Sequence, residues 1–277
     1  MTVARALVLG GGGIAGIAWE TGVLAGAAEA GLDPAQADFI VGTSAGATVA
    51  AQVTSGHPPG YWLERQVDPA LQNAEMSPPG MSVAVLWETW ARLMEEIADP
   101  DELRRRIAAM ALAADTVDEP ARRAVVAGRL AGDEWPRQHM ATVAVDAFSG
   151  ERHIFDAESG VGLIDAVAAS SAVPGVWPPV TIGSTRYVDG GIYSLTNADL
   201  AVGFDRVLVV APIPDPDLDR KIGPSDRGGT LVVSPDEESL AAFGADPLDP
   251  SVMAPSAQAG LAQGRRSAGE LVEFWGL

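Results

Sequence analysis

The stretch Gly42-Thr43-Ser44-Ala45-Gly46 decides the fold, because it joins an apolar run, Phe39-Ile40-Val41, to an alanine-rich run over residues 45–51. A strand, a tight turn and a helix in this order are the context that a G-x-S-x-G nucleophile turn requires. The two glycines lack a Cβ, so the chain can turn sharply and other backbone can come close to the serine. The amide of Ala45 then lies at a helix N-terminus, where backbone dipoles favour negative charge. We therefore predict that Ser44 is a nucleophile.

The residues before this stretch predict a parallel sheet. Residues 4–9 form an apolar run that ends at the glycines 10–13, and residues 17–30 have a helical pattern that ends at Gly31. With a strand at 39–41 and a helix at 45–54, they make a β-α-β-α opening, which implies a right-handed parallel crossover. We expect an α/β fold with a mostly parallel central sheet and helices on both faces, in three layers.

The rest of the chain adds strands and a closing helix. Further strands are expected at residues 142–148, 152–155, 180–182, 185–188, 206–211 and 230–234. A short helix is expected at 163–169, a loop rich in proline and aspartate at 212–226, and an amphipathic helix with its apolar stripe from Leu261 to Trp275. No repeat or linker is visible, so we expect a single domain over residues 1–277.

Composition excludes several classes of function. The chain of 277 residues has no cysteine, which excludes disulfides and thiolate chemistry. Its formal net charge of −19 argues against binding to nucleic acid, whose phosphates it would repel, and disfavours docking on strongly anionic membranes. There is no signal-peptide core and no apolar span of 18 residues, so we expect a cytoplasmic protein.

A serine nucleophile needs a base, and the sequence leaves two kinds open. The usual base is histidine, but the chain has only His57, His139 and His153, and an α/β-hydrolase triad places its histidine late in the chain. The other candidate is Asp189, which ends an expected strand, where ligands gather in open α/β sheets. A plain Asp-Gly turn is the structural alternative for this aspartate.

Four blocks of the chain, in order, resemble the patatin-like acyl hydrolases. These blocks are Gly10-Gly11-Gly12-Gly13 with Gly16, the stretch 42–46, Ala169-Ser170 with Pro174, and Asp189-Gly190-Gly191. The resemblance spans residues 10–191. It implies a catalytic dyad of Ser44 and Asp189 without histidine, and an oxyanion hole of backbone amides from Gly10, Gly11, Gly12, Gly13 and Ala45. It also implies an acyl ester or lipid as substrate, a transient contact with membrane surfaces, and no cofactor or metal.

One position departs from the family pattern. The first block of this family often has Arg or Lys just before its last glycine, whereas this chain has Ala15. Backbone donors survive that change, but a cation near the site is lost. We therefore expect neutral acyl esters to be turned over faster than lipids with anionic head groups.

The segment at about 57–136 has proline pairs and no convincing strand. Apolar residues recur at helical spacing from Val83 to Ile97 and again from Leu103 to Met110. We expect a helical excursion that covers the site. Two roles stay open for it: cover for one sheet face, or a lid or acyl-chain wall of Trp, Met and Leu side chains.

Two other functions remain as alternatives. Glycines 11, 13 and 16 also fit a dinucleotide fingerprint, but that fold needs an acidic residue near the end of the second strand, where this chain has Gly42-Thr43-Ser44. A patatin-like relative without catalytic activity is the second alternative. An activated serine distinguishes a hydrolase from both.

Overall fold

The computed structural model describes residues 3–77, 83–223 and 228–276. Its centre is an eight-stranded sheet in the order β5-β6-β3-β2-β1-β7-β8, with β4 paired to β3. The strands are β1 (Arg5–Leu9), β2 (Phe39–Thr43), β3 (Met140–Asp146), β4 (Arg152–Phe155), β5 (Val180–Ile182), β6 (Thr185–Asp189), β7 (Arg206–Val210) and β8 (Gly229–Val233). Every strand predicted from the sequence is present.

The direction of the strands divides the sheet into two parts. The five strands β3, β2, β1, β7 and β8 run parallel, whereas β4, β5 and β6 join through antiparallel pairs. The antiparallel part comes from hairpins, which need only short connections. The mostly parallel α/β sheet expected from the sequence is confirmed.

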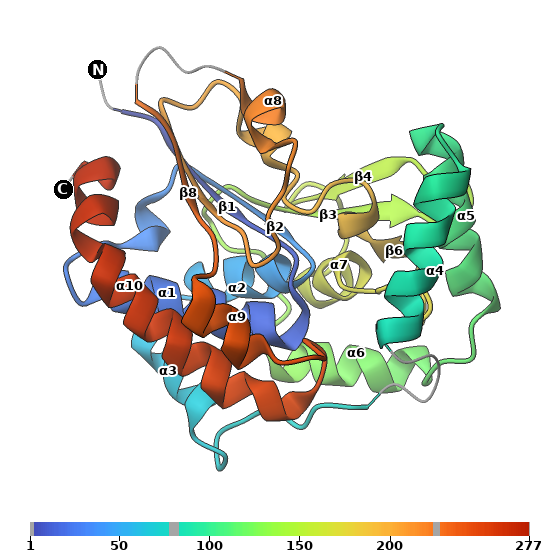
Figure 1. The fold of residues 1–277 in the computed structure, drawn as a ribbon, viewed down its shortest axis with the longest axis horizontal. Coiled ribbons are helices and arrows are strands. Elements are labelled where there is room, and N and C mark those ends of the chain that lie inside the picture. The colour runs from blue at the N-terminus through green and yellow to red at the C-terminus, as the bar shows by residue number, and fades with distance from the viewer. Residues whose placement is uncertain (1–2, 78–82, 224–227, 277) are drawn as a thin grey trace.

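Helices cover both faces of the sheet, but unequally (Figure 1). Along β1, Leu7 and Leu9 pack among residues of the longer helices, while Ala6 and Val8 point to the other face, as the two-residue period of a strand requires. The first face carries α1 (Gly13–Ala28), α2 (Ala45–Val53), α7 (Leu163–Ser170), α9 (Glu237–Phe243) and α10 (Met253–Trp275). The second face carries α8 (Leu218–Ile222) and a 3-10 turn, Ala198–Ala201, and at the antiparallel end α5 (Pro100–Ala113) packs on it through Ala108 and Ala111. The three layers are present, and one of them is thin.

Helices α1 and α10 pack backbone against backbone. A Cβ added to Gly260 would lie 2.3 Å from the carbonyl oxygen of Trp19, and one added to Gly22 would lie 2.3 Å from that of Ala257. Gly26 and Gly264, one turn further along, meet the partner backbone equally closely. Larger side chains would separate the helices, so this close packing explains why both carry glycine four residues apart.

Residues 59–128 form what we call the helical segment, with α3 (Pro59–Val67), α4 (Val83–Glu96), α5 (Pro100–Ala113) and α6 (Glu119–Gly128). No strand occurs in it among residues 59–77 and 83–128, and α4 and α5 lie together beside the antiparallel end of the sheet (Figure 1). Helix α4 is loosely attached, because Leu86 is its buried side chain while Val85, Trp87 and Met94 are exposed.

Three details differ from the sequence prediction. Helix α1 begins at Gly13 rather than at residue 17, because the last glycine of the block already takes part in the helix. The loop expected at 212–226 contains α8, and α9 was not predicted; both are shorter than the two turns that periodicity can detect. The expected breaks at Pro78-Pro79-Gly80 and the end of that loop, 224–226, lie outside the described residues. Among the described helices, none has the length and apolar content to cross a bilayer.

Candidate active site

Ser44 occupies the sharp turn between β2 and α2. Its backbone has φ 54° and ψ −112°, a strained conformation for a residue with a side chain. The flanking glycines are required by space: a Cβ on Gly42 would lie 2.3 Å from the carbonyl oxygen of Gly46, and one on Gly46 would lie 2.1 Å from that of Leu9. The turn therefore presses α2 against β1 and leaves the Ser44 side chain at the carboxyl edge of the sheet.

Asp189 ends β6 and lies beside this serine. The Ser44 hydroxyl donates a hydrogen bond of 2.6 Å to Oδ2 of Asp189, while Oδ1 accepts one of 2.7 Å from the amide of Gly191. Both residues are buried, with 7% of Ser44 and 4% of Asp189 exposed. The structure thus brings together the two predicted catalytic residues, which are far apart in the sequence.

The environment of Asp189 suits a base. Burial raises the pKa of Asp189 to about 6, although the hydrogen bonds from Ser44 and Gly191 act in the opposite direction. A solvated aspartate titrates near 3.9 and holds a proton weakly at neutral pH. The raised pKa lies closer to neutral pH, where a carboxylate accepts a proton more effectively.

The Ala-Ser block of the sequence holds both residues in place. The Ser170 hydroxyl, at the end of α7, accepts a hydrogen bond of 3.0 Å from the backbone amide of Ser44. Two residues further on, the carbonyl of Ala172 accepts one of 3.0 Å from the backbone amide of Asp189. This block therefore connects the nucleophile turn to the end of β6.

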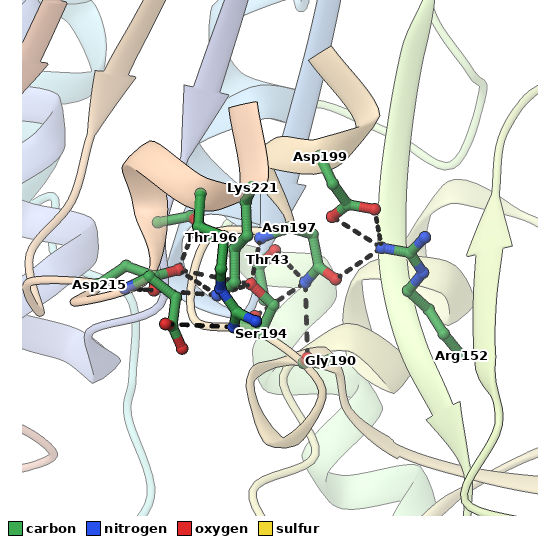
Figure 2. A network of polar contacts seen from close by, with 11 residues as sticks. Thr43, Arg152, Gly190, Ser194, Thr196, Asn197, Asp199, Asp215 and Lys221 are labelled. Carbon is green, nitrogen blue, oxygen red and sulfur yellow. Dashed lines mark hydrogen bonds and ion pairs between the residues drawn. The ribbon is translucent and has the colours of Figure 1, made fainter. Parts of the chain in front are cut away.

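A buried asparagine makes a second connection between the same two places (Figure 2). Asn197 is fully buried with a left-handed φ of 49°. Its side-chain amide donates to the hydroxyl of Thr43 at 3.0 Å and to the carbonyls of Ser194 at 2.9 Å and Gly190 at 3.5 Å. Thr43 precedes Ser44 and Gly190 follows Asp189, so one side chain fixes the backbone on both sides of the pair.

Further charged groups extend this network on either side of Asn197 (Figure 2). Arg152 lies 3.4 Å from the Asn197 side-chain oxygen and pairs with Asp199 at 2.7 Å. On the other side, Lys221 of α8 pairs with Asp215 at 2.7 Å and donates to the Ser194 hydroxyl at 2.9 Å. The sequence analysis did not find these residues, because each comes from a different loop or element and no local pattern marks them.

The glycine block divides into amides that are engaged and amides that are free. The Gly10 amide donates to the Val210 carbonyl at 3.0 Å and to the Glu20 carboxyl at 2.9 Å, and the Gly11 amide donates to the Leu195 carbonyl at 2.9 Å. These three hydrogen bonds hold the loop. Gly10 and Gly11, which the sequence analysis names as oxyanion donors, thus use their amides for other acceptors in this structure.

Gly12, Gly13 and Ala45 are placed differently. Their amides have no acceptor within the described ranges 3–77, 83–223 and 228–276, as the first amides of a helix ordinarily do not. Gly13 and Ala45 line the same cavity as Ser44. Two helix N-termini thus meet at the serine, where the backbone dipoles favour negative charge.

The cavity at Ser44 is small and has a cationic wall. Its volume is about 20 Å³, which is room for about one water molecule. Its wall includes Arg122, Arg129 and Trp177 as well as Ser44. Arg122 lies on α6 and Arg129 directly follows its last residue; both arginines are buried, like Val125 and Val126 between them. Charges at the core-facing positions of an amphipathic helix are the sequence signal that could have revealed them.

Two alternatives raised by the sequence, a histidine base and a dinucleotide site, find no support here. His57, His139 and His153 are all exposed, and none is a hydrogen-bond partner of Ser44 or Asp189. Among the described residues there is no cluster of His, Cys, Asp and Glu that could hold a metal ion. The second strand ends in the buried Thr43, without the carboxylate that a ribose-binding site needs.

Comparison with known proteins gives a family and several distant structural likenesses. No curated protein sequence matches the chain. VipD from Legionella pneumophila matches with 12% identity and a TM-score of 0.49, over 97% of this chain and 67% of that one. The type III effector ExoU matches with 18% identity and a TM-score of 0.41, over 96% of this chain and 53% of that one. ExoU in its complex with SpcU from Pseudomonas aeruginosa matches with 16% identity and a TM-score of 0.43, over 98% and 52%.

The chain thus spans about two thirds of VipD and about half of ExoU. Nothing about substrate or partner follows from likenesses of this strength. The family model is more specific, since it matches residues 7–202, which include the glycine block, the serine turn, the Ala-Ser block and Asp189. The chain therefore belongs to the patatin-like phospholipase family.

Proposed function

We propose that this protein is a serine acyl hydrolase that cleaves a carboxylic ester of a lipid with a Ser44–Asp189 dyad. Asp189 accepts the hydroxyl proton as Ser44 Oγ attacks the ester carbonyl carbon, which forms a tetrahedral oxyanion. The free amides of Gly12, Gly13 and Ala45 stabilise that oxyanion. As the intermediate collapses, the carbon–oxygen bond to the alcohol breaks, Asp189 returns the proton to the leaving alkoxide, and Ser44 keeps the acyl group.

The second half repeats these steps with water. Asp189 takes a proton from the water that attacks the acyl carbonyl, and the same amides hold the second oxyanion. Collapse breaks the bond to Ser44 Oγ, which recovers its proton from Asp189 and releases the fatty acid. The cavity at Ser44 has room for one such water.

The observation that carries this proposal is the 2.6 Å bond between two buried groups, the Ser44 hydroxyl and the Asp189 carboxylate. A structural Asp-Gly turn would explain the bond from Gly191 but not the second carboxylate oxygen aimed at a strained serine. The positive φ of Ser44 also favours the proposal, because backbone strain is concentrated at functional turns.

An acyl chain requires more room than this conformation offers. Ligand pockets measure about 300–1,000 Å³, whereas the cavity at Ser44 measures about 20 Å³. Apolar residues of α4, α5 and the 173–177 loop form a cluster around Leu86 and Trp177, next to that cavity. In this proposal the helical segment is the acyl-chain wall, and α4, whose one buried side chain among residues 84–96 is Leu86, moves when substrate enters.

Active-site labelling tests the proposal directly. A fluorophosphonate probe with a short alkyl chain should modify the wild type at Ser44, as mapped by mass spectrometry of the digested protein. Ser44→Ala should abolish labelling, while Ser184→Ala, at an exposed hairpin serine, should label as the wild type does. Labelling of another serine in Ser44→Ala, or no labelling of folded wild-type protein, would contradict the proposal.

A further inference from the structure

Arg122 is a cation buried in the wall of the cavity that contains Ser44. It lies on α6, is 5% exposed, and lines the cavity together with Ser44 and Ala45. Its guanidinium carbon lies 3.8 Å from the centre of the Trp177 ring, within the range of a cation–π contact. The side chain is therefore held in a fixed place beside the nucleophile.

The charge of Arg122 is only partly balanced by its neighbours. Glu75 is engaged by Arg129, which donates two hydrogen bonds to its carboxylate, at 2.8 and 2.5 Å. Arg122 approaches the same carboxylate only to 3.8 Å, too far for a hydrogen bond. The single carboxylate of Glu75 thus faces the guanidinium groups of Arg122 and Arg129, which leaves one excess positive charge on the pair.

Arg122 also has a donor, Nη1, that makes no hydrogen bond within the described part of the chain and lies 3.8 Å from a carboxylate oxygen of Glu75. This nitrogen is buried. Buried donors of this kind are rare in native proteins and costly, the more so when charged. Burial, helped by the nearby charge of Arg129, lowers the pKa of Arg122 to about 9, so the group still carries its proton at neutral pH.

The catalytic base does not account for this cation either. Burial raises the pKa of Asp189 against the opposing effect of the hydrogen bonds from Ser44 and Gly191, and Arg122 is not among the groups that shift it. A guanidinium offers a planar fork of donors that matches phosphate oxygens. The unsatisfied donor, the excess charge and the shared cavity all indicate an anionic group of the substrate close to the scissile ester.

We propose that Arg122 determines specificity by binding the phosphate of a glycerophospholipid whose neighbouring ester is attacked by Ser44. This inference rests on the proposed acyl hydrolase function. It reverses the expectation drawn from Ala15, because the cation absent from the glycine block is supplied from α6. Phosphate-bearing esters are then better substrates than neutral esters with the same acyl chains.

Short-chain substrates below their micellar concentration test this without interference from a lipid surface, which the net charge of −19 would repel. Dihexanoyl phosphatidylglycerol and dihexanoylglycerol carry the same acyl esters with and without phosphate. Arg122→Gln should raise KM for the phosphate-bearing ester about 10- to 100-fold, the range of a lost charged hydrogen bond, and leave kcat nearly unchanged. Its loss on dihexanoylglycerol should be smaller, so the preference for the phosphate-bearing ester, as the ratio of the two kcat/KM values, should fall about 10- to 100-fold.

Two variants make the assignment specific. Arg123→Gln changes the adjacent, half-exposed arginine, which pairs with Asp133 and Asp165. This variant should change neither KM nor kcat on either ester. Arg122→Lys keeps the charge but loses the planar fork of donors. Its KM for the phosphate-bearing ester should therefore lie between those of the wild type and Arg122→Gln. An equal loss of Arg122→Gln on both esters, or no loss on either, would overturn the proposal.

Binding measurements separate this inference from the proposed function. Calorimetric titration of Ser44→Ala with dihexanoyl phosphatidylglycerol should show binding that is lost in the Ser44→Ala, Arg122→Gln double variant, whether or not the wild type hydrolyses the lipid. Inorganic phosphate should inhibit dihexanoylglycerol hydrolysis only weakly, since it lacks the acyl chains. Micromolar inhibition by phosphate, with no preference between the two esters, would assign Arg122 to a free anion and contradict the proposal.

Discussion

The nucleophile turn and the helical segment are built in opposite ways. In the turn, residues 42–46 are all buried and a Cβ on either glycine would strike backbone. In the helical segment, α4 contributes Leu86 to the interior and exposes Val85, Trp87 and Met94. Close backbone contacts fix the turn and leave no room for a side chain at Gly42 or Gly46. In the helical segment, by contrast, α4 is held by a few side chains.

This difference follows the demands of each part in the proposed mechanism. Oxyanion donors and a nucleophile act only when held to a fraction of an ångström, so they lie where the backbone is most constrained. A wall for an acyl chain must give way to a flexible apolar ligand, so it is made of Trp, Met and Leu side chains. The predictions below test whether the two parts differ as strongly as their packing indicates.

The largest effect is expected from the dyad. Ser44→Ala and Asp189→Asn should each lower kcat on a short aryl ester by at least about 10³-fold, and the double variant should lose little more, because groups that act as one unit fail together. Steady-state kinetics on the four proteins measures this. His57→Gln, His139→Gln and His153→Gln are the controls and should lose less than about tenfold. If the double variant lost as much activity as the two single losses multiplied together, Ser44 and Asp189 would not act as one unit.

The next largest effect is expected from the glycine block. A Cβ at Gly12 would lie 2.5 Å from the Cβ of Pro212, so Gly12→Ala must move the loop and its free amides. We expect kcat to fall about 10²- to 10³-fold, the usual cost of an oxyanion donor. Gly132→Ala is the matched control, since nothing lies within 4 Å of its added Cβ. A rise in KM with kcat unchanged would show that the loop only binds substrate.

A moderate effect is expected from pH. Asp189 accepts a proton only when ionised, and burial raises its pKa to about 6. The ratio kcat/KM should therefore fall about tenfold for each pH unit below 6 and level off above it. A profile of the wild type from pH 4.5 to 8, with circular dichroism at each end to show that the fold persists, measures this. A midpoint near 4 would mean that Asp189 is solvated during turnover.

The smallest effect is expected from the helical segment. Trp87 is 44% exposed and touches Trp90 edge-on, with ring centres 5.2 Å apart. Trp87→Gln should change the free energy of unfolding by no more than about 0.5 kcal/mol, as for most exposed positions. Thermal melting at fixed protein concentration measures it. A loss above about 2 kcal/mol would show that α4 is as firmly packed as the nucleophile turn.

The sequence predicted the features that lie within one short stretch and missed those that form between distant stretches of the chain. The strand, turn and helix around Ser44 are encoded within residues 39–54, and the order of the four blocks led to Asp189 before any geometry was known. The split of the glycine amides was not predictable, because the acceptors of Gly10 and Gly11 come from Val210, Glu20 and Leu195.

The cationic wall and the asparagine network were missed for the same physical reason. Arg122 reaches the cavity only because α6 packs beside Trp177, and Asn197 acts between two strand ends that meet in space alone. Periodicity marks a buried face, but it does not say which distant group will meet that face. The pairing of polar side chains that are distant in the sequence is therefore the part of the site that could not be predicted without the structure.

The packing of α1 on α10 has a consequence for biosynthesis. Of the residues 13–28, nearly all are buried, and the backbone that covers Gly22 belongs to residues 257–261. A ribosome adds about 5–20 residues per second, so the first helix waits on the order of tens of seconds for its partner. During that interval the face of α1 that α10 later covers stays exposed, and exposed apolar surface of this kind promotes aggregation and the binding of chaperones.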